Sequence, residues 1–283
     1  MSETLFKKYN VPVPRYTSYP TANSFGPFDE TDYLKAVETS NDATADNISF
    51  YIHVPFCRHL CHYCGCNSVA MAKPDRITEY FETLHKEIDL LLPHLRKGRR
   101  ISQIHYGGGS PSSMPLHFIR SINEHLLSAF ETIDRPEIAI ECHPGYLKEE
   151  DWHYLLDSGF NRFSLGIQDF NDEVLRCVNR QPALLPVETI MRILREGGAK
   201  VNFDFIYGLP KQSVSAFVST IKKAISLRPD RLVTFSYAHL PSLFKRQMIL
   251  EKAGLPSQNE KLKMFEEASK TLQAAGYVPI GMD

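Results

Sequence analysis

The chain has 283 residues, of which 43% are hydrophobic and 23% charged, and its formal net charge is −1. This length suits one large α/β domain or two small ones, and the charge balance requires no basic face for nucleic acid. No stretch approaches the roughly 20 apolar residues of a membrane helix, and the first residues lack the segments of a signal peptide. We therefore expect a cytoplasmic protein with no membrane or nucleic-acid partner.

The first 47 residues differ from the rest of the chain. They contain four prolines among turn-forming residues, Pro12, Pro14, Pro20 and Pro27, and proline interrupts regular structure. We predict an irregular N-terminal arm over residues 1–47, with one helix near residues 29–40. The alternative is a disordered tail. The aromatic residues of the arm instead indicate that it packs against another part of the protein; they are Tyr16, Tyr19 and Phe25.

From Ile48 onward, short apolar strand-like segments alternate with amphipathic helix-like segments. The predicted strands are 49–54, 101–106, 137–142, 163–167, 201–206 and 231–237. The predicted helices are 77–95, 116–130, 149–158, 172–178, 186–196, 214–226 and 259–275. Six such repeats in succession predict an α/β domain over residues 48–283, with a parallel sheet and helices outside it.

Repeats of this kind, continued without a reversal, close or partly close into a barrel. We therefore predict a partial, TIM-like (β/α)6 barrel, and the alternative is an open doubly wound sheet. The barrel is favoured because polar residues follow every strand, as they do at the working end of barrels. A last strand is predicted over residues 277–282. Since the chain stops within it, we expect a fragment, or a chain whose remaining part is a separate domain.

Four of the six cysteines fall within ten residues, at Cys57, Cys61, Cys64 and Cys66. Clustered cysteines in a cytosolic chain of this size indicate metal binding or catalysis. The spacing C-x3-C-x2-C allows a compact loop to aim three thiolates at three corners of an iron–sulfur cube. Such clusters normally take four cysteines, so three ligands leave one iron open to a reactant, as in catalytic metal sites.

Two other interpretations of the loop stay open. One is a structural zinc site with nitrogen ligands from His59 or His62, and the other is a four-cysteine cluster that uses Cys66. The two remaining cysteines are expected to be buried rather than to bind metal. Alternation along the strand turns Cys142 away from Glu141, and Cys177 lies in a helical, apolar context.

A C-x3-C-x2-C loop after a first barrel strand resembles the radical S-adenosylmethionine (SAM) superfamily. The resemblance implies one [4Fe–4S] cluster on Cys57, Cys61 and Cys64, whose open iron binds the amino and carboxylate groups of SAM. It also implies that the residue before the third cysteine, Tyr63, lies near the adenine.

Further motifs are similar to those of the oxygen-independent coproporphyrinogen III oxidases. They run from about Tyr16 to Asp283 and read YIHVPFC, CHYCGC, HYGGGSPS, GIQDFN, VNRQ, DFIYGLPKQ, PDRL, SYAHLP and GMD. The CGC element, with Cys66, separates this family from haem chaperones and haem-degrading methyltransferases, which usually lack the fourth cysteine. The family's proteins carry a C-terminal helical domain, which we expect to be absent from this chain.

Polar residues at the other strand ends gain roles through the same resemblance. Without the resemblance, Gly107–Ser110 is either a tight turn or a loop that binds a carboxylate. Glu141 is either a surface acid or a residue that contacts a ligand. Asp204 lies inside an apolar strand and needs a hydrogen-bond partner there. In the family, the matching residues contact SAM: Tyr51, Gly108, Gly109, Ser110, Glu141, Gln168, Arg180, Asp204 and Ala238. Two SAM molecules are implied, with Tyr63 and Cys66 near the second, and no side chain is assigned as catalytic.

The family's motifs are altered at two places in this chain. Ser110 stands where the family usually has threonine, which keeps the hydroxyl, and Cys142-His143-Pro144 replaces the more typical Val-Asp-Pro.

The resemblance implies radical chemistry on a porphyrinogen. A reduced cluster donates an electron to SAM, and the resulting 5′-deoxyadenosyl radical takes a hydrogen from a propionate of coproporphyrinogen III. Carbon dioxide leaves, an acceptor takes the remaining electron, and a vinyl group remains; two rounds give protoporphyrinogen IX in haem biosynthesis. An electron donor such as flavodoxin or ferredoxin and a monomeric state are expected. The alternatives are a haem chaperone-like, haem-binding protein and an inactive truncated core.

Overall fold

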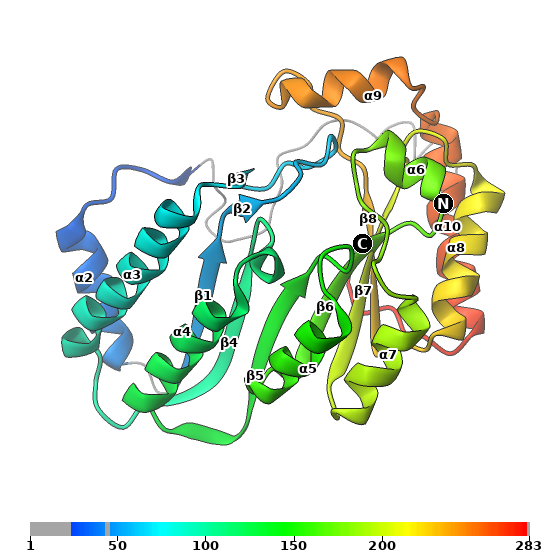
Figure 1. Cartoon of the computed structure of the whole chain (residues 1–283). Helices are drawn as coiled ribbons and strands as arrows, with labels where there is room; N and C mark the ends of the chain where they lie inside the picture. Colours follow the sequence, from blue (N-terminus) through cyan, green and yellow to red (C-terminus); the bar gives the residue numbers. More distant parts are fainter. Residues whose placement is uncertain (1–23, 43–45, 282–283) are drawn as a thin grey trace. The chain divides into compact units, whose positions relative to one another are not determined.

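The computed structural model describes residues 24–42 and 46–281 (Figure 1). The chain divides into two compact units, Met1–Thr44 with His94–Arg96, and Ala45–Pro93 with Lys97–Asp283. Our boundary between arm and barrel, at residue 47, stays a prediction. Much of the predicted arm lies outside the described residues, including Pro12, Pro14, Tyr16, Tyr19 and Pro20.

The smaller unit contains α2 (Glu30–Thr39) and the short η2 (Ser40–Asp42). Asp29 caps α2, because its side chain accepts a hydrogen bond from the backbone amide of Asp32 at 2.9 Å. The predicted helix near residues 29–40 is therefore confirmed. Phe25 is 66% exposed, so it does not show the packing that we predict for it.

The larger unit is built on one parallel sheet of six strands. Their order in the sheet is their order in the chain: β1 (Asn47–Val54), β4 (Arg100–Gly108), β5 (Thr132–Cys142), β6 (Arg162–Gln168), β7 (Lys200–Tyr207) and β8 (Arg231–Ser236). A doubly wound sheet reverses its strand order part-way, so that alternative is wrong. Among the described residues β1 and β8 are the two edges of the sheet, and the partial (β/α)6 barrel is confirmed.

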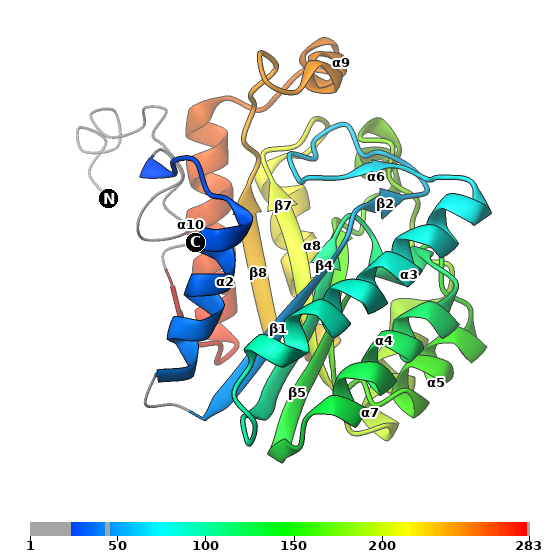
Figure 2. The ribbon, with the colours of Figure 1, turned by 90° about the vertical axis from the view of Figure 1, so that its left-hand side faces the viewer.

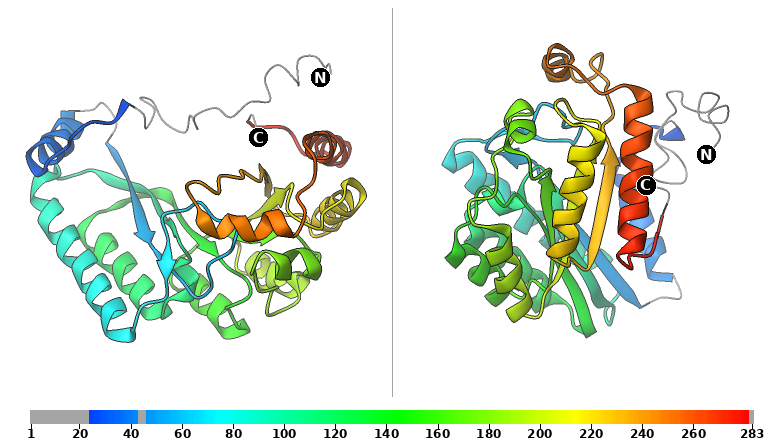
Figure 3. Two further views of the ribbon diagram at one scale, coloured as in Figure 1. Left: turned by 90° about the horizontal axis from the view of Figure 1, so that it is seen from above. Right: turned by 90° about the vertical axis from the view of Figure 1, so that its right-hand side faces the viewer.

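Helices follow the strands in turn. The longer ones are α3 (Pro74–Leu91), α4 (Leu116–Ala129), α5 (Glu149–Asp157), α7 (Val187–Glu196), α8 (Val214–Ser226) and α10 (Gln258–Ala274). The short ones are η3 (Leu92–His94), η4 (Pro111–Ser113), α6 (Asp172–Cys177), η5 (Lys245–Gln247) and α9 (Met248–Lys252). Figures 1 and 3 show α3, α4, α5, α7 and α8 along the same face of the sheet. None of the helices in the described part of the chain is long and apolar enough to span a membrane.

Two details of the predicted order differ from the structure. The residues from Tyr277 to Gly281 do not form the last strand that we predict; Met282 lies outside the described residues. The sequence also gives no sign of a two-stranded sheet, in which β2 (Phe56–Cys57) pairs with β3 (Val69–Ala70).

The alternation of side chains along each strand explains why one face of the sheet is apolar and the other is polar. Along β6, Phe163, Leu165 and Ile167 are buried, whereas the residues between them are half-buried. This period of two sends apolar side chains toward the helices and polar side chains to the opposite face. The carboxyl ends of the strands, the β2–β3 pair and α9 lie at one end of the larger unit (Figure 2).

Candidate cofactor site

The cysteine loop, residues 57–66, is closed at its base by the β2–β3 pair. The amide of Val69 donates to the Pro55 carbonyl at 2.9 Å, and the amide of Met71 donates to the Cys57 carbonyl at 2.9 Å. The loop therefore leaves and re-enters the fold at one place, directly after β1. A pair of two-residue strands is too short to give a sequence pattern, which is why it was missed.

Residues that follow α6 hold the far side of the loop. The amide of His62 donates to the Val178 carbonyl at 3.0 Å, and the Asn179 side chain donates to the Leu60 carbonyl at 3.0 Å. Asn179 has φ of 56°, a left-handed conformation that asparagine adopts more readily than most residues. Tyr63 packs on the buried cluster under the loop, whose members are Val174, Val178, Ile206, Leu209, Tyr237 and Leu250.

The four thiols of the loop differ in exposure, and the pKa values of Cys57, Cys64 and Cys66 differ from one another. Cys61 is buried, Cys57 and Cys64 are half-buried, and Cys66 is exposed. Burial, with the negative charge of Cys64 and Cys61, raises the pKa of Cys57 to about 11. Hydrogen bonds from Cys66 lower the pKa of Cys64 to about 6, and the same interaction raises the pKa of Cys66.

Arg180 lies against the buried thiol. Its Nη1 is 3.6 Å from Cys61 Sγ and donates to the Tyr63 hydroxyl at 3.2 Å, while Nη2 donates to the Gly166 carbonyl. Arg180 lies three residues after the end of α6 and is 9% exposed, so its charge is buried within the fold. Arg180 therefore places a positive charge directly beside one of the three thiol sulfurs that the spacing predicts to bind metal.

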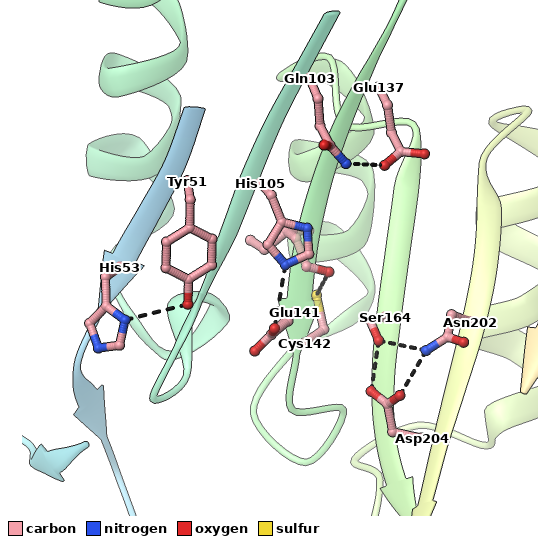
Figure 4. Close-up of polar contacts among 11 residues, drawn as sticks. Tyr51, His53, Gln103, His105, Glu137, Glu141, Cys142, Ser164, Asn202 and Asp204 are labelled. Carbon is pink, nitrogen blue, oxygen red and sulfur yellow. Dashed lines mark hydrogen bonds and ion pairs between the residues drawn. The ribbon is translucent and has the colours of Figure 1, made fainter. Parts of the chain in front are cut away.

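A second group of polar side chains crosses the ends of β1, β4 and β5 (Figure 4). The ring of Tyr51 stacks on that of His105, with centroids 5.8 Å apart and planes 15° from parallel. His105 Nε2 lies 3.4 Å from Glu141 Oε1, and a Cβ on Gly107 would lie 2.8 Å from that oxygen and 2.9 Å from the Tyr51 hydroxyl. Sequence reasoning missed His105; its only signal is the position two residues before the glycine run.

Asp204, which is half-buried, has the partners that we expect its carboxylate to need. Ser164 Oγ donates to its carboxylate at 2.7 Å and Asn202 Nδ2 at 2.8 Å (Figure 4). Burial raises the pKa of Asp204, and these two hydrogen bonds oppose that rise. Asn202 in turn accepts from Arg231 Nε at 3.0 Å.

The glycine run, whose first two glycines end β4, fits closely against the cysteine loop. Gly108 has φ of 113°, which favours glycine. A Cβ on Gly109 would lie 2.4 Å from the Pro55 carbonyl oxygen and 3.0 Å from Cys57 Sγ. Ser110 is 6% exposed and accepts a hydrogen bond from Ser113 Oγ at 2.7 Å.

The remaining predicted residues lie at the exits of β6 and β8. Gln168 ends β6 with φ of 68°, and Ala238 is exposed two residues beyond β8. Asp169 does not face the site: it is 3% exposed and accepts hydrogen bonds from Gln212 Nε2 at 2.7 Å and Thr220 Oγ1 at 2.5 Å.

The two cysteines outside the loop have different environments. Cys142 is 4% exposed, which confirms that it is buried. Cys177 is only half-buried, so the expectation that it belongs to the core is wrong.

Known proteins show to which family this chain belongs. The family model described as the radical SAM superfamily matches residues 51–224.

The chain belongs to the radical SAM superfamily.

Membership of this superfamily implies a [4Fe–4S] cluster and SAM as cofactors. Two curated relatives are both named oxygen-independent coproporphyrinogen III oxidase. The protein from Escherichia coli (strain K12) is 40% identical over 281 residues, which cover 99% of this chain and 61% of the relative. The protein from Synechocystis sp. is 37% identical over 284 residues, which cover 100% of this chain and 61% of the relative. The chain thus spans about three fifths of the length of these relatives.

The solved structures agree with the sequences. The structure of coproporphyrinogen III oxidase from Escherichia coli, described as a radical SAM enzyme, matches with a TM-score of 0.89 and 38% identity. The match covers 99% of this chain and 63% of that one.

The radical SAM cluster fits the residues of the cysteine loop. The loop offers thiol sulfurs as ligands. Two guanidinium groups lie beside it: Arg180 contacts Cys61 Sγ and Arg246 contacts the Cys64 carbonyl. Gly109 places no side chain between the end of β4 and Cys57. Within residues 24–42 and 46–281, no three His, Cys, Asp or Glu side chains are grouped to hold a single metal ion. A cubane cluster is a different case, because its cysteines bind separate irons.

Proposed function

We propose that this chain carries the catalytic barrel of an oxygen-independent coproporphyrinogen III oxidase, which converts two propionates of coproporphyrinogen III to vinyl groups and yields protoporphyrinogen IX. The observation that supports the proposal most directly is the C-x3-C-x2-C loop at the exit of β1, with Arg180 against its buried thiol. The names of the relatives supply the substrate. When bound, the cluster and SAM supply a carbon radical that abstracts hydrogen from the substrate, chemistry that belongs to the cofactor.

We infer that Cys57, Cys61 and Cys64 hold the cluster, with one iron left for SAM. The anchored base of the loop and the contacts from Val178 and Asn179 restrain these thiols before any metal binds. Arg180 offers its positive charge to the Cys61 thiolate, and a guanidinium also suits a carboxylate.

The residues proposed to contact SAM surround the same end of the sheet. They are Tyr51, Gly108, Gly109, Ser110, Glu141, Gln168, Arg180, Asp204 and Ala238. The carboxylates of Glu141 and Asp204 accept hydrogen bonds from ammonium or ribose hydroxyl groups, and the backbone amides of the glycine run are donors for a carboxylate. We further propose a second SAM near Tyr63 and Cys66, an electron donor such as a flavodoxin or ferredoxin, and a monomer in the cytoplasm.

The decisive experiment is an anaerobic reconstitution with iron and sulfide, followed by dithionite, SAM and coproporphyrinogen III. Mass spectrometry should detect 5′-deoxyadenosine together with products that have lost one and two carboxyl groups. Formation of 5′-deoxyadenosine without decarboxylation would overturn the oxidase assignment for this chain and leave the superfamily chemistry intact.

A cysteine variant tests the cluster ligands. Cys61→Ala should abolish SAM cleavage and most iron binding, and Cys177→Ala, a half-buried cysteine outside the loop, is the matched control and should retain both. Full SAM cleavage by Cys61→Ala would show that the cluster is not held as proposed.

A further inference from the structure

Gln247, in η5, is a buried amide that contacts two separate parts of the site. It is 1% exposed, and its Nε2 donates to the Tyr63 carbonyl at 3.0 Å and to the Ala238 carbonyl at 3.2 Å. Its Oε1 accepts from the amide of Leu240 at 2.6 Å. Both the donor and the acceptor of the side chain are therefore used.

Two neighbours of Gln247 also contact the cysteine loop. Arg246 donates to the Cys64 carbonyl from Nη2 at 2.7 Å and from Nε at 3.3 Å. The ring of Phe244 lies so close to Gly65 that a Cβ there would be 3.2 Å from it. The segment Phe244–Gln247, which we call the strap, thus meets three consecutive residues of the loop, from Tyr63 to Gly65.

Helix capping does not explain the Gln247 side chain. Gln247 is the residue before α9, but its side chain makes no capping hydrogen bond to that helix. A buried amide whose nitrogen and oxygen both make hydrogen bonds is a rigid connector, and its removal leaves backbone groups without partners. Its two carbonyl partners belong to Tyr63 and Ala238, one on the cysteine loop and one after β8.

We propose that the strap fixes the cysteine loop against the exit of β8, and that Gln247 is a positioning residue that sets the place of SAM between Tyr63 and Ala238. The role in SAM binding rests on the proposed function. The restraint on the loop does not, because it follows from contacts of the protein alone.

The first test uses the protein without metal. Amide hydrogen exchange, read by mass spectrometry, should be faster in the cysteine-loop peptide of Gln247→Ala than in that of the wild type, because local opening governs exchange. Gln258→Ala makes the same substitution at an exposed residue at the start of α10 and should leave loop exchange unchanged. Equal loop exchange in Gln247→Ala and the wild type would overturn the restraint.

The second test uses the reconstituted protein. With the same iron content per chain, Gln247→Ala should bind SAM roughly 5- to 50-fold more weakly, the loss expected from one or two hydrogen bonds. The positioning role would be overturned if Gln247→Ala bound SAM as tightly as the wild type. It would also be overturned if the variant held less iron in proportion to its weaker SAM binding. If the wild type itself binds no SAM, the proposed function fails and this role with it, whereas the exchange result for the strap still holds.

A second variant keeps the proposal testable if Gln247→Ala does not fold. Arg246→Ala removes two hydrogen bonds to Cys64 from a half-buried side chain and opens no buried cavity. It should also speed exchange in the loop, and exchange at the wild-type rate would overturn the strap.

Discussion

Gly109→Ala tests the contact between the glycine run and the cysteine loop. The new Cβ would lie 2.4 Å from the Pro55 carbonyl oxygen and 2.6 Å from its carbon. Real Cβ contacts are almost never below 3.0 Å, so the backbone must move by at least about 0.6 Å. Both atoms belong to the backbone, and a side-chain rotation cannot relieve the overlap. Overpacking of this kind costs about 1–3 kcal/mol.

This cost translates into a measurable change in thermal stability. At about 2–4 °C for each kcal/mol in a chain of this size, Gly109→Ala should lower Tm by roughly 2–12 °C. The same displacement moves Cys57, whose Sγ is 3.0 Å from the added Cβ, so iron content after reconstitution should fall as well.

Circular dichroism melts and iron analysis of the same preparations provide the assay. Gly26→Ala is the matched control, because a Cβ at Gly26 has no neighbour within 4 Å, and its Tm and iron content should equal those of the wild type. A Tm within 1 °C of wild type together with normal iron loading in Gly109→Ala would refute the reasoning.

Three further predictions concern stability. Trp152→Ala, at a fully buried side chain, should cost about 3–5 kcal/mol in urea unfolding; a cost below about 1 kcal/mol would contradict it. Tyr106→Phe, which removes a 2.7 Å hydrogen bond to Asn123, should cost about 1 kcal/mol, and no change would contradict it. Burial raises the pKa of the Asp204 carboxyl in the folded state. Above the pKa that this group has in the unfolded chain, the unfolded state loses the proton more readily, so the free energy of unfolding falls as the pH rises. Asp204→Asn should therefore gain more in Tm at pH 7 than at pH 4; equal changes would contradict this.

The sheet was predictable because its signals are repeated and local. Each strand carries a run of apolar residues at a period of two or without interruption, and each is followed by an amphipathic helix, so six weak signals support one another. The predicted strand at residues 277–282 lacked this support, since no helix follows it. In the structure the described part of that segment, which ends at Gly281, is not a strand.

The site was predictable where it depends on spacing along the chain. The cysteine spacing and the glycine run are local motifs; the cysteine loop follows β1 as predicted, and the glycine run lies at the end of β4, which extends two residues further than predicted, to Gly108. The environment of Arg180 was not predictable, because its partner Cys61 is 119 residues away. His105 was missed for a related reason: a single histidine in a strand gains meaning only when Tyr51 and Glu141 are seen on its neighbours.

The strap has a consequence for the order in which the protein is made. Arg246 and Gln247 are 182 and 184 residues from the loop residues they contact. At about 5–20 residues per second, a ribosome takes roughly 10–40 s to progress from the cysteine loop to these residues. During that time the strap has not been synthesised and cannot contact the loop. Iron and sulfide delivered after the strap has folded would meet a loop that is held at its base by β2–β3, by Val178 and Asn179, and by the strap.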